Sequence, residues 1–439
     1  MRKTIILHGY SDRGASFQEL ATFLSKNGIQ AVTVFVGDYI TLEDTVTVPD
    51  LASAFARALA DKGISDGPGE INLIVHSTGS LVAREWMTRF YLERGRPCPV
   101  RHYLMLAPAN FGSPLAAKGK TMLGRIIKGW KTGFESGLQV LNALEMASPY
   151  TWSLARRDLF GETSFYRPDQ CLAAVLVGTK PYGTGLRQLA DENGGDGTVY
   201  VCTANLNATG LTAEFHGKDE DTKVDFWKRA ADPIAFGVFA DRDHSSITRP
   251  EEGNPDLKAM ILDFLRVQDA TDYAAYRAQC ETHTRSALPD IPHKDIFHRY
   301  QNLVSRVTDS LGFPVRDYFL EFYQRALTPE DEYTVDDLMV KVHRDILETV
   351  HACKQDPSYR SLLFDLTDLQ QVLATGQELM FSLSAAPASE LVEFYCGEKA
   401  NDVSELPVPQ GASFWQENQT MLADIVIRRQ QAERVFKFL

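Results

Sequence analysis

The sequence predicts an α/β fold, with a doubly wound, mostly parallel sheet followed by a smaller, mainly β sandwich-like domain. Three observations support this prediction. Short apolar runs alternate with helical apolar spacing through the first 265 residues, which is typical of parallel strands joined by right-handed crossovers. One interval between strands, residues 115–170, is too long for a plain connection and predicts an inserted helical cap. From Ile296 onward, short strand-like segments replace the helical pattern.

The length of the chain is consistent with this division. Its 439 residues are enough for two or three domains with large cores. We expect the first domain to span residues 1–268 and the second to span residues 293–439. Residues 269–292 are expected to form a linker made of a helix and a turn.

Composition and charge exclude several classes of protein. The hydrophobic fraction of 44% and the charged fraction of 23% are typical of soluble globular proteins. A net charge of −13 argues against general nucleic-acid binding. The six cysteines are scattered without a C-x-x-C pair, which indicates reduced, buried thiols. The apolar N-terminal run is too short for a signal peptide or a membrane span, so the expected location is the cytoplasm, unless export follows a route that needs no signal peptide.

The first elements predict a β-α-β unit whose first turn is a candidate oxyanion site. Thr4 to Leu7 predicts a strand, a helical pattern follows, and Ala31 to Val36 predicts a second strand. The first strand ends in His8-Gly9-Tyr10, and a turn there can direct a backbone N–H toward a substrate. We therefore expect the N–H of Tyr10 to be an oxyanion donor. The alternative is an ordinary loop in which the glycine only permits the turn.

The stretch around Ser77 joins a strand to a helix with no room for a loop. Ile71 to Val75 predicts a buried strand, and apolar residues recur at helical spacing from Ser80. So sharp a turn holds its central side chain clear of the sheet, beside the free N–H groups of the helix start. Ser77 is the predicted nucleophile and the N–H of Thr78 the other oxyanion donor. Val75 occupies a position where the G-x-S-x-G pattern has glycine, so a plain Ser-Thr-Gly turn is the competing interpretation.

A fourth predicted strand, Tyr103 to Pro108, ends near Asn110. The carboxyl ends of parallel strands meet at one edge of a sheet, where the active sites of such sheets lie. With the His8-Gly9 turn and the His76-Ser77-Thr78-Gly79 turn, this strand end makes residues 3–114 resemble the α/β-hydrolase fold and, within it, the lipase-like esterases. The resemblance implies a catalytic triad in the chain order Ser, then Asp or Glu, then His, each on a loop after a strand.

Two later loops fit the acid and base of that triad. Leu172 to Gly178 predicts a strand, and the Gly-Gly-Asp-Gly-Thr-Val stretch around Asp196 looks like the acid loop of lipase-like hydrolases. Asp196 would accept the imidazole N–H of His244, which follows the apolar strand Ile234 to Ala240 and would take the proton of Ser77. Rival acids are Asp191, Asp241 and Asp243, and less favoured bases are His216, His76 and His8.

The inserted segment contains a basic and apolar stretch from Lys118 to Phe134, with no acid between Leu115 and Phe134. Its basic residues are Lys118, Lys120, Arg125, Lys128 and Lys131. A basic amphipathic helix suits peripheral contact with anionic lipid, although it could also serve only to cover the site with its apolar face. The side chains expected to contact substrate or to belong to the cap are His76, Asn110, Phe111, Ile126, Trp130 and Phe134.

Residues 293–439 predict a β-rich domain for docking. Tyr300 to Thr308 and Val315 to Tyr323 are strand-like, and Asp309 to Pro314 between them predicts a hairpin. Residues 335–350 fit either a helix or a strand. Further strands are expected at residues 361–366, 378–383, 391–396 and 421–427. No Ser, His, Asp or Cys cluster with catalytic spacing occurs, so we expect docking to lipid, to a protein partner or to a second copy of the chain.

The predicted function is hydrolysis of carboxylic esters of lipids, of lipase or phospholipase type, through an acyl-enzyme on Ser77. The expected substrate is an acyl-ester lipid, with no metal or organic cofactor. An acyltransferase or thioesterase with the same triad is an alternative within this chemistry. A catalytically silent hydrolase scaffold that serves as an interaction module is an alternative from another class, and Val75 favours it.

Overall fold

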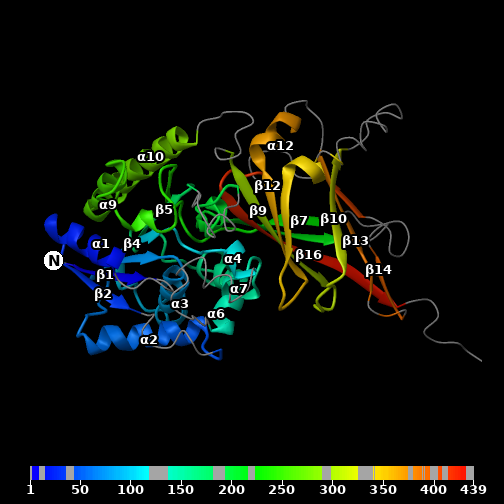
Figure 1. Cartoon of the computed structure of the whole chain (residues 1–439). Helices are drawn as coiled ribbons and strands as arrows, with labels where there is room; N and C mark the ends of the chain where they lie inside the picture. The colour runs from blue at the N-terminus through cyan, green and yellow to red at the C-terminus, as the bar shows by residue number, and fades with distance from the viewer. Residues whose placement is uncertain are drawn as a thin grey trace, which may run out of the picture. The chain divides into compact units, whose positions relative to one another are not determined.

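The computed structural model of the chain contains two compact units (Figure 1). It describes residues 2–8, 15–35, 44–117, 137–180, 193–215, 223–288, 298–324, 340, 342–373, 379–387, 389, 391–395, 404–407 and 414–431. Unit 1 comprises Met1–Asn207 and Lys228–His298, and unit 2 comprises Ala208–Trp227 and Arg299–Leu439. Unit 2 therefore includes a short segment, residues 208–227, that lies in the sequence between the two parts of unit 1.

Unit 1 is built on a six-stranded sheet in which every neighbouring pair is parallel, in the order β2-β1-β3-β4-β5-β8. Its strands are β1 (Lys3–His8), β2 (Ala31–Phe35), β3 (Ile71–His76), β4 (Val100–Leu106), β5 (Leu172–Gly178) and β8 (Ala235–Phe239). Every residue of β3 and β5 is buried, because helices cover both faces of the sheet. The strand order reverses after β2, which confirms the predicted doubly wound α/β class.

The helices of unit 1 flank this sheet (Figure 1). They are α1 (Ala15–Lys26), α2 (Val48–Asp61), α3 (Gly79–Phe90), η1 (Leu92–Arg94), α4 (Pro114–Ala117), α6 (Leu138–Leu144), α7 (Pro149–Asp158), α8 (Val201–Ala204), η3 (Ser246–Thr248), α9 (Asp256–Arg266) and α10 (Ala270–Ala287). Helix α2 begins at a capping box between Thr47 and Asp50, and its Phe55 packs edge-on against Trp86 of α3. No helix in the described part of the chain is long and apolar enough to cross a membrane.

Helix α10 occupies most of the segment expected to be a linker. Tyr273 donates to the carbonyl oxygen of Ala173 in β5, and Thr284 accepts the N–H of Val238 in β8. These contacts make α10 part of unit 1, which ends at His298 rather than at residue 268. The helix has few buried residues, so its apolar pattern does not show that it packs on the sheet.

Unit 2 consists of two sheets that share one core. The larger has the order β11-β12-β9-β16-β6-β7, with β14 also paired to β16, and the smaller has the order β10-β13-β15. The strands are β6 (Thr209–Phe215), β7 (Lys223–Phe226), β9 (Tyr300–Asp309), β10 (Tyr318–Gln324), β11 (Leu347–Ala352), β12 (Tyr359–Asp365), β13 (Leu379–Ala385), β14 (Val392–Tyr395), β15 (Ser404–Pro407) and β16 (Gln419–Gln431). Phe322 of the smaller sheet packs edge-on against Phe364 of the larger, with ring centroids 4.9 Å apart, as in a sandwich.

Strand β6 is integral to the larger sheet of unit 2, although in the sequence it lies between the two segments of unit 1. It runs parallel to β16 from Thr209 opposite Met421 to Phe215 opposite Ile427. Its Leu211 and Phe215 are buried in the core of unit 2. The expected second domain, residues 293–439, is therefore incomplete without residues 208–227.

The hairpin expected between β9 and β10 is wrong, because the two strands enter different sheets. The turn itself is present: the Asp309 carboxylate accepts the N–H groups of Leu311 and Phe313 at 3.0 and 2.9 Å, and Gly312 has a φ of +83°. A turn signal specifies that the chain reverses but not which strand becomes its neighbour. Both edges of β9 are already paired, with β12 and with β16.

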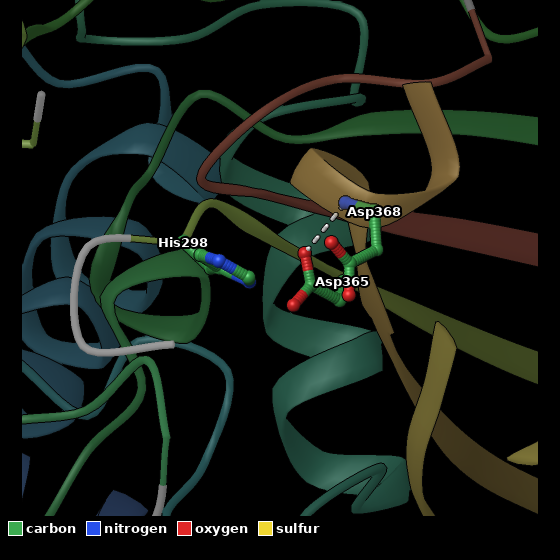
Figure 2. A group of neighbouring side chains, drawn as sticks. All are labelled: His298, Asp365 and Asp368. Carbon is green, nitrogen blue, oxygen red and sulfur yellow. Dashed lines mark hydrogen bonds between the residues drawn. The ribbon is translucent and has the colours of Figure 1, made fainter. Parts of the chain in front are cut away.

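The strand expected over residues 361–366 ends at Asp365. Figure 2 shows the cause at the start of α12 (Leu366–Leu373): the Asp365 carboxylate turns back to accept the N–H of Asp368 at 3.2 Å. It also accepts the N–H of Thr367 at 2.9 Å. In the ambiguous segment 335–350, residues 342–346 form a π-helical turn and β11 follows at Leu347, so both local patterns are present.

Candidate active site

Ser77 lies at the sharp turn between β3 and α3. Its φ of 53° is left-handed, which is costly for a residue with a side chain and marks a strained turn. Its N–H donates to the carbonyl of Leu106 at 3.2 Å. Its own carbonyl accepts the hydroxyl of Ser80 at 2.8 Å and the N–H of Ala109 at 3.3 Å. Val75 is fully buried in β3, so the turn forms despite the larger side chain there.

Ser77, His244 and Asp196 form one hydrogen-bonded chain. The Nε2 atom of His244 is 3.0 Å from Oγ of Ser77, and its Nδ1 atom is 2.9 Å from Oδ2 of Asp196. A carboxylate requires the proton to be on Nδ1, which leaves Nε2 to accept the serine hydroxyl. The N–H of His244 also donates to the carbonyl oxygen of Asp196 at 3.0 Å. This geometry suits an activated serine, its base and the acid that orients the base.

Asp196 is completely buried, and its second oxygen is also satisfied. Oδ1 accepts the N–H groups of Thr198 and Val199, both at 2.9 Å. The glycines at 194 and 197 have φ values of 73° and 88°, a left-handed conformation that lets the loop turn tightly on both sides of the acid. The carboxylate is therefore held in one orientation, with Oδ2 toward His244.

The rival candidates that the structure describes have other partners. Asp243 accepts the N–H groups of Ser245 and Ser246 at 2.9 and 2.8 Å, and so caps the turn after His244. Asp241 lies beside the guanidinium of Arg242, 3.5 Å away. Several other predicted residues lie outside the described residues or side chains: His8, Tyr10, Ile126, Trp130, Phe134, Asp191 and His216, together with the basic stretch from 118 to 134.

The N–H of Thr78 is available at the start of α3. Thr78 directly precedes the first residue of the helix, and among the described residues its N–H has no hydrogen-bond acceptor. An unpaired N–H at a helix start, next to Ser77, suits the negative charge of an oxyanion.

A buried arginine fixes the loop that carries His244. The Arg242 guanidinium donates to four backbone carbonyls farther along the same loop, those of Ser246, Arg249, Glu252 and Asn254. Its own carbonyl accepts the N–H of Lys180 at 2.9 Å. A Cβ atom on Gly178 would lie 2.0 Å from that carbonyl oxygen, so only glycine allows β5 to pass this close.

A second buried arginine joins α3 to the described part of the inserted segment. Arg84 donates to both carboxylate oxygens of Asp158 in α7, at 2.8 and 3.0 Å. Their neighbours in the sequence form a second ion pair with the charges exchanged between the helices: Glu85 of α3 accepts from Arg157 of α7. Burial disfavours the charged form of Arg84, but Asp158 outweighs it and raises the pKa of Arg84 above its usual value. These two ion pairs hold α7 against α3, the helix that begins directly after the turn at Ser77.

Asn110 and Phe111, two of the expected substrate contacts, are buried in the interior of unit 1. The side-chain amide of Asn110 donates to the carbonyl of Ala204 at 2.8 Å. The backbone carbonyl of Asn110 accepts from Arg84 at 3.0 Å. The Phe111 ring lies 5.9 Å from the same guanidinium. Their described contacts shape the loop after β4.

His76, the third described member of that set, contacts His244. Its Nε2 atom is 2.8 Å from the carbonyl oxygen of His244, and the ring centroids are 4.7 Å apart. The sequence prediction missed this contact, as it missed Arg84 and Arg242. Arg84 and Glu85 are charged residues within the run from residue 79 to 88 of α3, which only the structure shows to be fully buried. Among the described residues of unit 1, no three His, Cys, Asp or Glu side chains lie close enough to hold a metal ion.

Comparison with known proteins agrees with this architecture. The model of the Alpha/beta hydrolase family matches residues 5–256. The solved structure of phospholipase PlaB from Legionella pneumophila superposes with a TM-score of 0.83 at 24% identity, covering 100% of this chain and 96% of that chain. PlaB in complex with thio-NAD gives a TM-score of 0.80 at 23% identity with the same coverage. At these identities the likeness is one of fold. No curated protein matches the sequence.

Proposed function

Because the chain belongs to the alpha/beta hydrolase family, we propose that it is a serine hydrolase of carboxylic esters, with Ser77 as nucleophile, His244 as general base and Asp196 as the orienting acid. The observation that carries this proposal is the continuous hydrogen-bonded chain from Ser77 through His244 to the buried Asp196. The left-handed elbow at Ser77 adds support, because it holds the hydroxyl clear of the sheet.

The reaction follows from the donors and acceptors in that chain. Oγ of Ser77 attacks the ester carbonyl while Nε2 of His244 takes its proton. The N–H of Thr78 stabilises the tetrahedral oxyanion, and the N–H of Tyr10 is the second proposed donor. His244 then returns the proton to the departing alcohol, which leaves an acyl group on Ser77. Water, activated by the same imidazole, releases the acid and restores the serine.

The proposed substrates are acyl esters of lipids, of lipase or phospholipase type. The structural relative that spans the whole chain is named a phospholipase, which supports this class. The basic and apolar stretch from Lys118 to Phe134 adds support, since such a composition suits anionic lipid.

The first experiment tests the nucleophile. Ser77→Ala is expected to lower the hydrolysis of a soluble short-chain ester by about 10⁴-fold or more and to abolish covalent labelling by a fluorophosphonate. Thermal unfolding checks that the variant is folded. Activity of the variant within tenfold of wild type would exclude Ser77 as the nucleophile. Absence of labelling in the wild type would favour a silent scaffold.

The second experiment tests the lipid substrate separately from the chemistry. Changing Arg125, Lys128 and Lys131 together to Gln is expected to weaken hydrolysis of anionic phospholipid vesicles, because each basic residue contributes about 1 kcal/mol at such a surface. High salt should have the same effect on the wild type. The soluble ester is the control and should be hydrolysed at an unchanged rate. Parallel changes on both substrates would contradict a role for this stretch at lipid surfaces.

A further inference from the structure

We propose that His76 is a positioning residue that holds His244 in its working orientation, an inference that rests on the proposed serine-hydrolase function. The Nε2 atom of His76 lies 2.8 Å from the carbonyl oxygen of His244. A carbonyl oxygen only accepts, so Nε2 of His76 carries a proton and donates it. The contact therefore acts on the backbone of the base and not on its reacting nitrogen.

This hydrogen bond completes the fixation of His244. Asp196 already binds the imidazole through its carboxylate and the preceding peptide through its carbonyl. His76 binds the following peptide. Both adjoining peptide groups are then fixed, so the backbone that carries the ring cannot shift without breaking a buried hydrogen bond, and Asp196 opposes rotation of the ring itself. The Nε2 atom of His244 is thus kept 3.0 Å from the hydroxyl of Ser77.

The His76 side chain is itself confined. It is buried, with the Phe17 ring of α1 5.6 Å away and the ring of His244 4.7 Å away, measured between centroids. It has little room to adopt another rotamer, so the donor is pre-organised for the His244 carbonyl.

The position of His76 in the chain gives this contact a particular effect. His76 is the last residue of β3, and Ser77 is the next residue. The backbone that places the nucleophile therefore also places the donor that restrains the base. A small displacement of the end of β3 carries both groups together, so the distance between Oγ and Nε2 is preserved. The same contact keeps Nε2 of His76 from accepting a proton, because that nitrogen carries its proton toward a carbonyl oxygen.

The experiment compares three replacements that differ in where they carry a donor. Gln has an amide nitrogen at a reach similar to Nε2 of histidine, Asn carries its amide nitrogen nearer the backbone, and Leu has no donor. His76→Leu and His76→Asn are expected to lower kcat on a soluble ester by about 10- to 100-fold, because a misplacement near 1 Å can cost about 10²-fold. KM should change little. His76→Gln should recover most of kcat.

His102→Gln is the matched control. His102 is also a buried histidine, on the neighbouring strand β4, and it also hydrogen-bonds to a backbone carbonyl, that of Val267 at 2.8 Å. It does not contact the triad, so its replacement is expected to change the unfolding midpoint but leave kcat unchanged. The rate of fluorophosphonate labelling per folded molecule is the second readout, since it reports the reactivity of Ser77 directly.

The outcomes separate this proposal from the proposed function. If wild type hydrolyses esters and all three His76 variants label at the wild-type rate per folded molecule, the positioning role is refuted. Equal losses for Gln and Asn would also refute it, because the position of the donor would then not matter. If wild type neither hydrolyses esters nor reacts with the fluorophosphonate, it is the serine-hydrolase function that fails.

Discussion

Replacing Asp196 by Asn tests the orienting acid with almost no change of shape. In the wild type, Oδ2 faces Nδ1 of His244 while Oδ1 accepts the N–H groups of Thr198 and Val199. An Asn side chain has only one oxygen, and the N–H groups of Thr198 and Val199 need it as their hydrogen-bond acceptor. Its NH₂ group must then face His244. The imidazole can meet that donor only with Nδ1 unprotonated, so its proton moves to Nε2 and it can no longer accept the proton of Ser77.

The size of the effect follows from the alternative arrangement. To keep the productive tautomer, the amide must flip and present its NH₂ group to Thr198 and Val199. Both of their N–H groups would then be buried without an acceptor, at a cost of about 1–3 kcal/mol each. A total of about 2–6 kcal/mol leaves the productive form at about one molecule in 30 to one in 10⁴. We expect kcat for Asp196→Asn to fall by that factor.

The assay is steady-state hydrolysis of a soluble ester, with the thermal midpoint as a check on folding. Asp243→Asn is the matched control, because Asp243 caps a turn one residue from His244 without touching the imidazole. It should retain activity within about tenfold of wild type. A larger loss for Asp243→Asn than for Asp196→Asn would refute this reasoning and reassign the acid.

Two further predictions concern stability. Gly178→Ala puts a methyl group against the backbone oxygen of Arg242, so the unfolding free energy measured by chemical denaturation should fall by about 1–3 kcal/mol, and kcat should fall with it. Gly237→Ala should cost less, because the two nearest contacts of its new Cβ are the flexible ends of the Leu176 and Met260 side chains. Burial lowers the pKa of His102 to about 4 from 6.5, so between these values the unfolded chain binds the proton and the folded chain does not. The unfolding free energy should therefore fall as the pH drops from 6.5 to 4, by up to about 3 kcal/mol. In His102→Gln, the unfolding free energy measured with urea should depend less steeply on pH. Identical pH slopes for the two proteins would contradict this assignment.

The central sheet could be predicted from the sequence because its information is local. A fully buried parallel strand such as β3 or β5 is a short apolar run, and the helices between strands carry their own periodicity. The candidate site follows from the same logic. Ser77, Asp196 and His244 each come after a strand, and parallel strands bring their carboxyl ends to one edge.

What could not be predicted depends on partners distant in the sequence. Nothing in β6 indicates that it pairs with β16, because strand pairing leaves no trace in the local pattern of either strand. His76 and Arg242 were not identified as supports because their acceptors are backbone carbonyls. A carbonyl is present at every residue, so its selection as an acceptor is decided only by the folded structure.

The pairing of β6 with β16 also sets an order of events while the protein is being made. The ribosome reaches Gln419 about 200 residues after Phe215, which takes on the order of 10–40 s at about 5–20 residues per second. Throughout that interval β6 lacks its parallel neighbour, and its Leu211 and Phe215 lack most of the core that buries them. Its other edge can pair with β7, but an apolar strand with one open edge is a site of aggregation or chaperone binding. A nascent chain that stalls before β16 would already contain Ser77, Asp196 and His244 and still be a target for quality control.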